Sequence, residues 1–125
     1  MQSARQSVVP ALRVKSYEDS RRFYERLGFA EDWTHLFGPG FPVFASISRH
    51  GQTIFLTEHT GDCAFGGLVH FYLPDMDVDA YYAACLAAGV EVDQAPGNNL
   101  GEEMRDMVIL DPDGNRLVFI THAPD

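Results

Sequence analysis

The stretch Phe23-Tyr24-Glu25-Arg26-Leu27-Gly28-Phe29 carries the strongest signal for the fold. Its apolar residues are spaced as on one face of a helix, and Gly28 suits the left-handed conformation that ends helices. Upstream, Ser16 is followed three residues later by Asp19, a pairing typical of a helix N-terminus. The stretch therefore predicts a helix that begins near Ser16 and stops at Gly28.

The same pattern occurs a second time, 61 residues further along the chain. A second helical pattern begins near Asp77, a good N-cap residue, and stops at Gly89. In the apolar strand before each helix, His70 stands 61 residues after Val9. Two copies of one unit in a small domain predict that corresponding residues surround a shared pocket.

Short apolar runs around the helices predict the strands. They cover residues 8–14, 29–35, 43–48, 53–57, 68–73, 90–92, 104–110 and 116–121, and 94–103 is expected to be a loop. The order is β-α-β-β-β twice, which predicts an α+β fold with mixed or antiparallel sheets. We expect one domain over residues 1–125, with module one at about 8–58 and module two at about 68–121.

Composition excludes several classes of protein. The net charge of the 125 residues is −9, and the pI is near 4.8, which disfavours nucleic acid and suits a cationic small ligand. No apolar run approaches the roughly 20 residues that span a bilayer, and the N-terminus is polar, so a cytoplasmic protein without membrane contact is expected. Cys63 and Cys85 lack metal or redox spacing.

The first helix end, the doubled order and Asp111-Pro112-Asp113-Gly114-Asn115 together resemble the vicinal oxygen chelate superfamily. Within it, the chain is most similar to bleomycin resistance proteins and glyoxalase-like relatives, over roughly Val8 to Thr121. The resemblance implies two βαβββ modules that form a curved mixed-sheet cup. It also implies a homodimer with two ligand grooves at the dimer interface. The superfamily contains both metalloenzymes and metal-free binding proteins.

The resemblance also places four metal-ligand positions, at the first and last strand of each module. They correspond to Val9, Phe55, His70 and Val118, of which only His70 can bind a metal. A catalytic divalent site needs about three protein ligands, so no metal, no cofactor and no catalytic residue are predicted. Adjacent strand residues face opposite ways, which disfavours Glu58-His59 as a metal-binding pair.

Apolar groups at former ligand positions predict a drier binding cavity. In the bleomycin-binding group, the region after the first helix contributes aromatic rings, and the relatives' Trp-Gly pair corresponds here to Leu100-Gly101, which lacks a ring. The predicted ligand-binding residues are Trp33, Phe37, Phe41, Phe44, Phe55, His70, Leu100 and Glu102. Acidic side chains that could rim the groove and attract a cation are Asp32, Glu58, Asp62, Glu102, Glu103 and Asp106.

Three functions fit these observations. The first is a metal-free homodimer that binds and sequesters a flat, cationic small molecule such as a bleomycin-type antibiotic. The alternative is a glyoxalase- or dioxygenase-like lyase or oxidoreductase with a displaced metal site, built from His70 with Glu58 or His59. A third is a structural or regulatory dimer, in which Phe44, Phe55 and Phe71 pack the cup shut.

Overall fold

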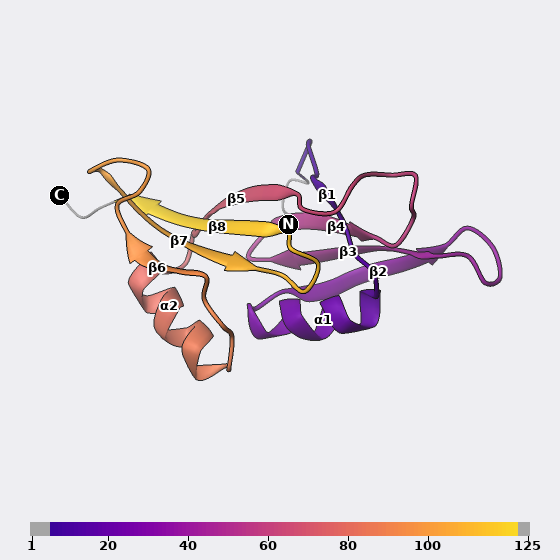
Figure 1. The fold of residues 1–125 in the computed structure, drawn as a ribbon, viewed down its shortest axis with the longest axis horizontal. Helices are drawn as coiled ribbons and strands as arrows, with labels where there is room; N and C mark the ends of the chain where they lie inside the picture. Colours follow the sequence, from indigo (N-terminus) through magenta and orange to yellow (C-terminus); the bar gives the residue numbers. More distant parts are fainter. Residues whose placement is uncertain (1–5, 123–125) are drawn as a thin grey trace, which may run out of the picture.

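The structure, a computed structural model, describes residues 6–122, which form the predicted order of strands and helices twice (Figure 1). The first module consists of β1 (Ala11–Arg13), α1 (Tyr17–Arg26), β2 (Ala30–Leu36), β3 (Val43–Arg49) and β4 (Gln52–Thr57). The second module consists of β5 (Leu68–Tyr72), α2 (Val78–Ala87), β6 (Gln94–Gly97), β7 (Met104–Leu110) and β8 (Arg116–His122).

Each module forms one four-stranded mixed sheet. The first sheet has the order β1-β4-β3-β2 and the second the order β5-β8-β7-β6. The first and last strands of each module pair in parallel, and the other neighbours are antiparallel. Both helices lie on the same side of the two sheets (Figure 1), so each sheet has one helix-free face. The predicted α+β fold of two βαβββ modules is confirmed.

The predicted helix ends are confirmed. The Ser16 hydroxyl accepts a hydrogen bond from the backbone N–H of Asp19 at 3.3 Å, and the Asp77 carboxylate accepts one from that of Ala80 at 2.8 Å. Each helix is followed by a glycine with positive φ, +99° at Gly28 and +79° at Gly89. These caps are local, which explains why the sequence revealed them.

Two strand predictions were wrong. Residues 90–92 form no strand, and the sixth strand is β6 (Gln94–Gly97), which lies within the stretch expected to be a loop. This strand is a four-residue edge of the second sheet that pairs irregularly with β7 and contains Pro96, so it has neither alternation nor β-branched residues. The first strand is also shorter than residues 8–14.

The strand register corrects one predicted ligand position. Ala11, not Val9, pairs with Phe55, as His70 pairs with Val118 in the second module. The two modules differ in the connection from strand to helix, where Pro74-Asp75-Met76 in the second module replaces a single Lys15 in the first. The first strands of the two modules are therefore offset by 59 residues and the helices by 61, so applying the helix offset to the first strand misplaced its ligand position.

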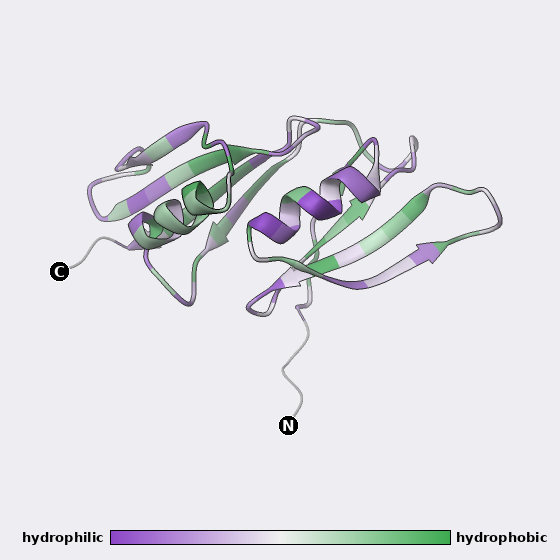
Figure 2. Ribbon diagram, turned by 90° about the horizontal axis from the view of Figure 1, so that it is seen from below, coloured by the Kyte–Doolittle hydropathy of each residue, from purple (hydrophilic) through white to green (hydrophobic). Residues whose placement is uncertain are grey.

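One hydrophobic core lies between the helices and the sheets and includes residues of both modules. The rings of Phe29 and Phe71, one from each module, meet at 5.6 Å. Seen from the helix side, α1 is mainly hydrophilic and α2 mainly apolar (Figure 2). A smaller cluster of Val108, Val118 and Ile120 lies on the helix-free face of the second sheet.

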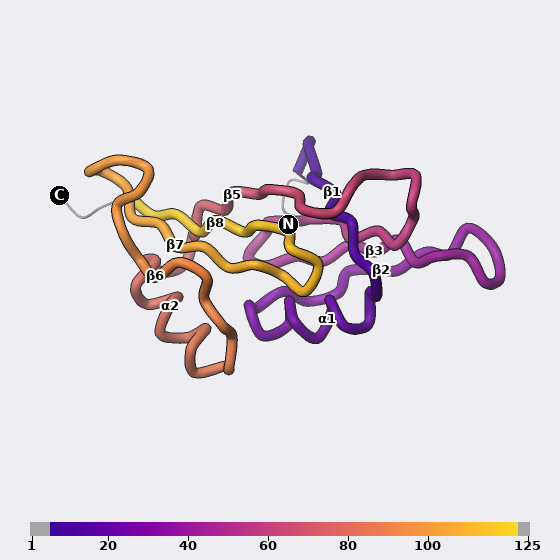
Figure 3. Tube along the Cα trace, in the orientation of Figure 1, coloured from indigo at the N-terminus to yellow at the C-terminus, as the bar shows by residue number. Residues whose placement is uncertain are grey.

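The chain passes from the first module to the second through residues 58–67 (Figure 3). The two modules are also held together by hydrogen bonds at the turn between β7 and β8. The Tyr24 hydroxyl of α1 donates to the Asp111 carboxylate at 2.8 Å, and the Asn115 amide donates to the same carboxylate and to the Arg13 carbonyl. The side chains of Tyr24, Asp111 and Asn115 are buried. The Asp111-to-Asn115 motif thus joins the two modules rather than lining a sheet face.

Candidate functional site

Three aromatic rings meet on the helix-free face of the first sheet. Trp33 and Phe55 lie on either side of Ser46 across β2, β3 and β4, and Phe44 is two residues before Ser46 on the same face of β3. The ring centroids are 6.0 Å apart for Trp33 and Phe44, 5.5 Å for Trp33 and Phe55, and 5.2 Å for Phe44 and Phe55. We call these three residues the aromatic cluster.

The aromatic cluster offers a ring surface to a ligand. The indole of Trp33 stacks on Phe44 at an interplanar angle of 19°, and Trp33 remains 44% exposed. Phe44 and Phe55 are half-buried. Flat aromatic groups gain free energy from such rings beyond the burial of their area.

The two other predicted aromatic residues lie at the tip of the β2–β3 hairpin. Phe37 and Phe41 are 62% and 53% exposed. The Phe37 ring meets His35 edge-on at 4.5 Å and His59 at 5.2 Å. The exposed rings therefore continue from the aromatic cluster toward the hairpin tip and the connection between the modules.

The remaining predicted site residues belong to the second module. His70 is exposed on β5 and borders a cavity of about 240 Å³ between the sheets, together with Gln6, Gln52 and Thr53. Leu100 and Glu102 are exposed in the loop between β6 and β7. This loop lies at the opposite end of the molecule from the β2–β3 hairpin (Figure 1). Within one chain, the predicted residues are therefore not brought together.

Several acidic residues expected at a groove rim have structural roles. The Glu58 carboxylate accepts hydrogen bonds from the backbone N–H groups of Tyr17 at 2.7 Å and Val43 at 2.9 Å. Asp62 accepts one from the Thr57 hydroxyl at 2.7 Å. Asp106 is 2% exposed and accepts bonds from Asn99. These carboxylates hold the chain in place.

Asp32 is different, because it lies beside the aromatic cluster. Its carboxylate accepts hydrogen bonds from the hydroxyls of Ser46 at 2.9 Å and Ser48 at 2.6 Å. The two serines were missed by sequence reasoning, since a serine in a strand carries no signal of its own. Their strand alternation with buried Ala45 and Ile47 was the available hint.

The corrected positions for metal ligands are Ala11, Phe55, His70 and Val118, and among them only His70 has a side chain that binds metals. Within residues 6–122, no three His, Cys, Asp or Glu side chains are grouped so that they could hold a metal ion. Across the same residues, no helix is long and apolar enough to cross a membrane.

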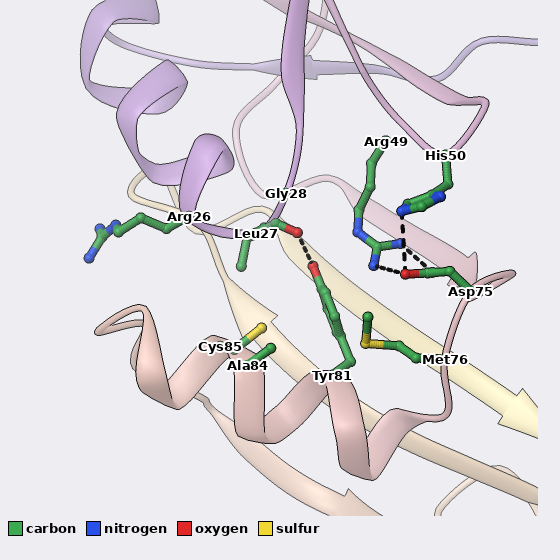
Figure 4. A pocket seen from close by; sticks show the side chains of 10 residues that line it. All are labelled: Arg26, Leu27, Gly28, Arg49, His50, Asp75, Met76, Tyr81, Ala84 and Cys85. Carbon is green, nitrogen blue, oxygen red and sulfur yellow. Dashed lines mark hydrogen bonds and ion pairs between the residues drawn. The ribbon is translucent and has the colours of Figure 1, made fainter.

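A second cavity, of about 220 Å³, lies on the helix side between the modules (Figure 4). The guanidinium of Arg49, whose side chain is 4% exposed, donates twice to Asp75, at 3.0 and 2.8 Å. The His50 Nε2 atom is 3.4 Å from Asp75, and Arg49 lies 4.6 Å above the Tyr81 ring. Arg49 of the first module and Asp75 of the second therefore pair with each other, and this ion pair between the modules forms part of the cavity wall.

The titratable groups of this cavity fit a structural role. Burial raises the pKa of Asp75, but the hydrogen bonds and charge of Arg49 outweigh it and hold the pKa below its ordinary value. Burial raises the pKa of the Cys85 thiol, which disfavours the nucleophilic thiolate. Burial likewise raises the pKa of Tyr81, whose hydroxyl donates to the Leu27 carbonyl at 2.5 Å.

The third hypothesis, a cup packed shut by three phenylalanines, was wrong about Phe71. Phe71 is 4% exposed and belongs to the main core, where it stacks on Phe119 at 5.0 Å. It lies on the helix side of the second sheet, whereas Phe44 and Phe55 lie on the helix-free face of the first. These side chains therefore do not close one cup together.

Solved structures share this fold. A bleomycin-binding protein complexed with bleomycin matches with a TM-score of 0.74 and 22% identity over 94% of this chain and 99% of that chain. A bleomycin resistance determinant encoded on the transposon Tn5 gives the same score and identity, over 95% and 99%. A virulence protein from Salmonella typhimurium matches with a TM-score of 0.70 and 20% identity, over 98% and 100%.

Sequence comparison supplies the family. A search of curated proteins found no significant match. The model of a family described as "Glyoxalase superfamily protein" matches residues 2–124, nearly the whole chain. The chain therefore belongs to the glyoxalase superfamily.

Proposed function

We propose that the protein binds and sequesters a flat aromatic small molecule of the bleomycin type, without a metal and without a reaction. The aromatic cluster of Trp33, Phe44 and Phe55 on an uncovered sheet face is the observation that carries this proposal. The similar fold of a protein complexed with bleomycin supports it. The four corrected ligand positions, with one histidine among them, favour binding over metal catalysis.

The working unit that we propose is a homodimer. The predicted ligand-binding residues lie at opposite ends of one chain, and a second copy would bring Leu100 and Glu102 of one subunit toward the aromatic cluster of the other. Large apolar side chains on the helix-free faces, such as Leu68 and Tyr72, are more than half exposed, which is typical of a surface that a partner covers.

Calorimetric titration of bleomycin into the full chain tests the proposal. We expect binding at micromolar protein, and Trp33→Ala should raise Kd about tenfold or more, because a stacking ring and its burial are lost. Leu86→Ala is the control, since Leu86 is 49% exposed on α2, away from the helix-free faces. Absence of any binding would contradict a bleomycin-type ligand.

Metal analysis tests the enzymatic alternative on the same sample. A stoichiometric metal in the purified protein, or a rise in melting temperature with Ni, Zn, Mn or Fe(II), would contradict a metal-free binding protein. We expect neither, and we expect the same bleomycin affinity with and without a chelator.

A further inference from the structure

A bulge in β2 places two consecutive side chains on the same face of the first sheet. Glu31 pairs with Ile47 and Trp33 with Ser46, so Asp32 is an extra residue without a partner in the ladder. Glu31 points to the helix side, where it accepts a hydrogen bond from the Tyr17 hydroxyl at 2.6 Å. Asp32 instead contacts Ser46 and Ser48 on the face that carries Trp33 and Phe44. In a regular strand, Asp32 and Trp33 would face opposite ways.

Two hydrogen bonds hold the Asp32 carboxylate in place, but they leave one of its two oxygens without a donor from the described residues. The hydroxyls of Ser46 and Ser48 both donate to the Oδ2 atom, and the Ser48 hydroxyl also forms a hydrogen bond with that of Thr53 at 2.8 Å. Within residues 6–122, the Oδ1 atom accepts no hydrogen bond from the protein, and Asp32 takes part in no ion pair. Asp32 is exposed, so its free oxygen is open to a ligand.

Charge and aromatic surface therefore coincide at this point of the sheet. We propose that Asp32 receives the positively charged group of a ligand whose flat ring stacks on Trp33, which makes Asp32 the residue that selects cationic aromatic ligands. This inference rests on the proposed function. It specifies a planar heteroaromatic molecule with a protonated nitrogen close to the stacked ring, because Asp32 and Trp33 are consecutive residues of β2.

The other acidic residues near this face do not offer the same contact. Glu58 and Asp62 are occupied by hydrogen bonds from the chain. Glu102 lies in the loop at the far end of the same chain and would approach this face only from the second copy of the proposed dimer. A cationic ligand on the aromatic cluster would therefore meet Asp32 as a neighbouring carboxylate with a free oxygen. Because Asp32 is exposed, we expect a moderate effect, about three- to tenfold in Kd.

A matched pair of dyes separates charge from stacking. At pH 7.5, 9-aminoacridine is cationic and acridine is neutral, and both are flat three-ring molecules. Fluorescence titration of the full chain should give tighter binding of 9-aminoacridine. Asp32→Asn should weaken 9-aminoacridine about fivefold and leave acridine unchanged, whereas Trp33→Ala should weaken both. The advantage of 9-aminoacridine should shrink at high salt.

Glu91→Gln is the matched control, because it removes one negative charge from an exposed residue that makes no ion pair among residues 6–122. Equal effects of Asp32→Asn and Glu91→Gln on the Kd of 9-aminoacridine would overturn the inference, because the net negative charge of the protein would then explain the preference. An Asp32→Asn variant that binds both dyes like the wild type, or binds both more weakly by the same factor, would also overturn it. In these cases the aromatic site stands. If neither dye binds the wild type, the inference fails, whereas the proposed function fails only if bleomycin does not bind in the calorimetric titration.

Discussion

Gly28 and Gly89 occupy the same position in the two modules but differ in their surroundings. A Cβ atom at Gly28 would lie 3.1 Å from Nε of the buried Arg49, whereas one at Gly89 would meet nothing within 4 Å. Both have positive φ, which costs an alanine about 1 kcal/mol or more. We expect Gly89→Ala to lower the free energy of unfolding by about 1 kcal/mol and Gly28→Ala by roughly 2–3 kcal/mol. Urea denaturation measures both, and equal losses would contradict the close approach to Arg49.

Tyr24 shows what the Asp111 motif does at the scale of single atoms. Burial raises the pKa of Tyr24 well above its ordinary value, and the Asp111 carboxylate raises it further, so the hydroxyl stays a donor. Tyr24→Phe removes that donor from a buried carboxylate and should cost about 1–3 kcal/mol of unfolding free energy. Tyr82→Phe should change it by no more than about 0.5 kcal/mol, because the Tyr82 hydroxyl makes no hydrogen bond within residues 6–122. A smaller loss for Tyr24→Phe than for Tyr82→Phe would contradict the role of this bond.

The elements differ in how far the sequence predicts them. Helices α1 and α2 were predicted with their caps, because Ser16, Asp77 and the two glycines act on their own neighbours. Strand β6 was not predicted, because its pairing with β7 is set by tertiary contacts. The same limit applies to the site: the aromatic residues were predicted, but the bulge at Asp32 depends on the register against β3.

The β3–β4 hairpin is tied to the β5–α2 connection by Arg49 and Asp75. The folded-state pKa of Asp75 lies below its ordinary value of about 3.9. The ion pair therefore stabilises the protein above that pH, and its contribution is lost as the pH falls through the folded-state pKa. Asp75→Asn leaves the buried Arg49 unpaired and should cost about 3 kcal/mol at pH 7.

The pH dependence of this variant separates the charge from the packing. The difference in unfolding free energy between wild type and Asp75→Asn, measured by urea denaturation, should shrink below about pH 4. Asp79→Asn removes the carboxylate of a more exposed ion pair with Arg105 and should cost less than about 1 kcal/mol at pH 7. A difference for Asp75→Asn that stays constant from pH 7 to 3 would show that its charge contributes nothing.

At the scale of the whole molecule, the internal repeat places two different surfaces side by side. The helix-free face of the first sheet carries the aromatic cluster, and that of the second sheet carries a small aliphatic cluster bordered by exposed Leu68, Tyr72 and Leu110. The sequence predicted the aromatic residues as ligand contacts. It did not predict the aliphatic residues of the second face, nor that one chain would leave both faces uncovered. Two unlike faces on each chain suit a symmetric dimer, in which the first sheet of one copy faces the second sheet of the other.

This arrangement makes a prediction about Leu68, which is 56% exposed on the helix-free face of the second sheet. A charge there would be buried without a partner in the proposed dimer, so Leu68→Asp should weaken dimerisation by tenfold or more and weaken ligand binding with it. Leu86→Asp places the same charge at a similarly exposed site on α2 and should leave both unchanged. Sedimentation equilibrium, with bleomycin titration of the same samples, measures the two effects. A wild-type chain that binds bleomycin as a monomer would contradict the shared groove and place the whole site on the first sheet.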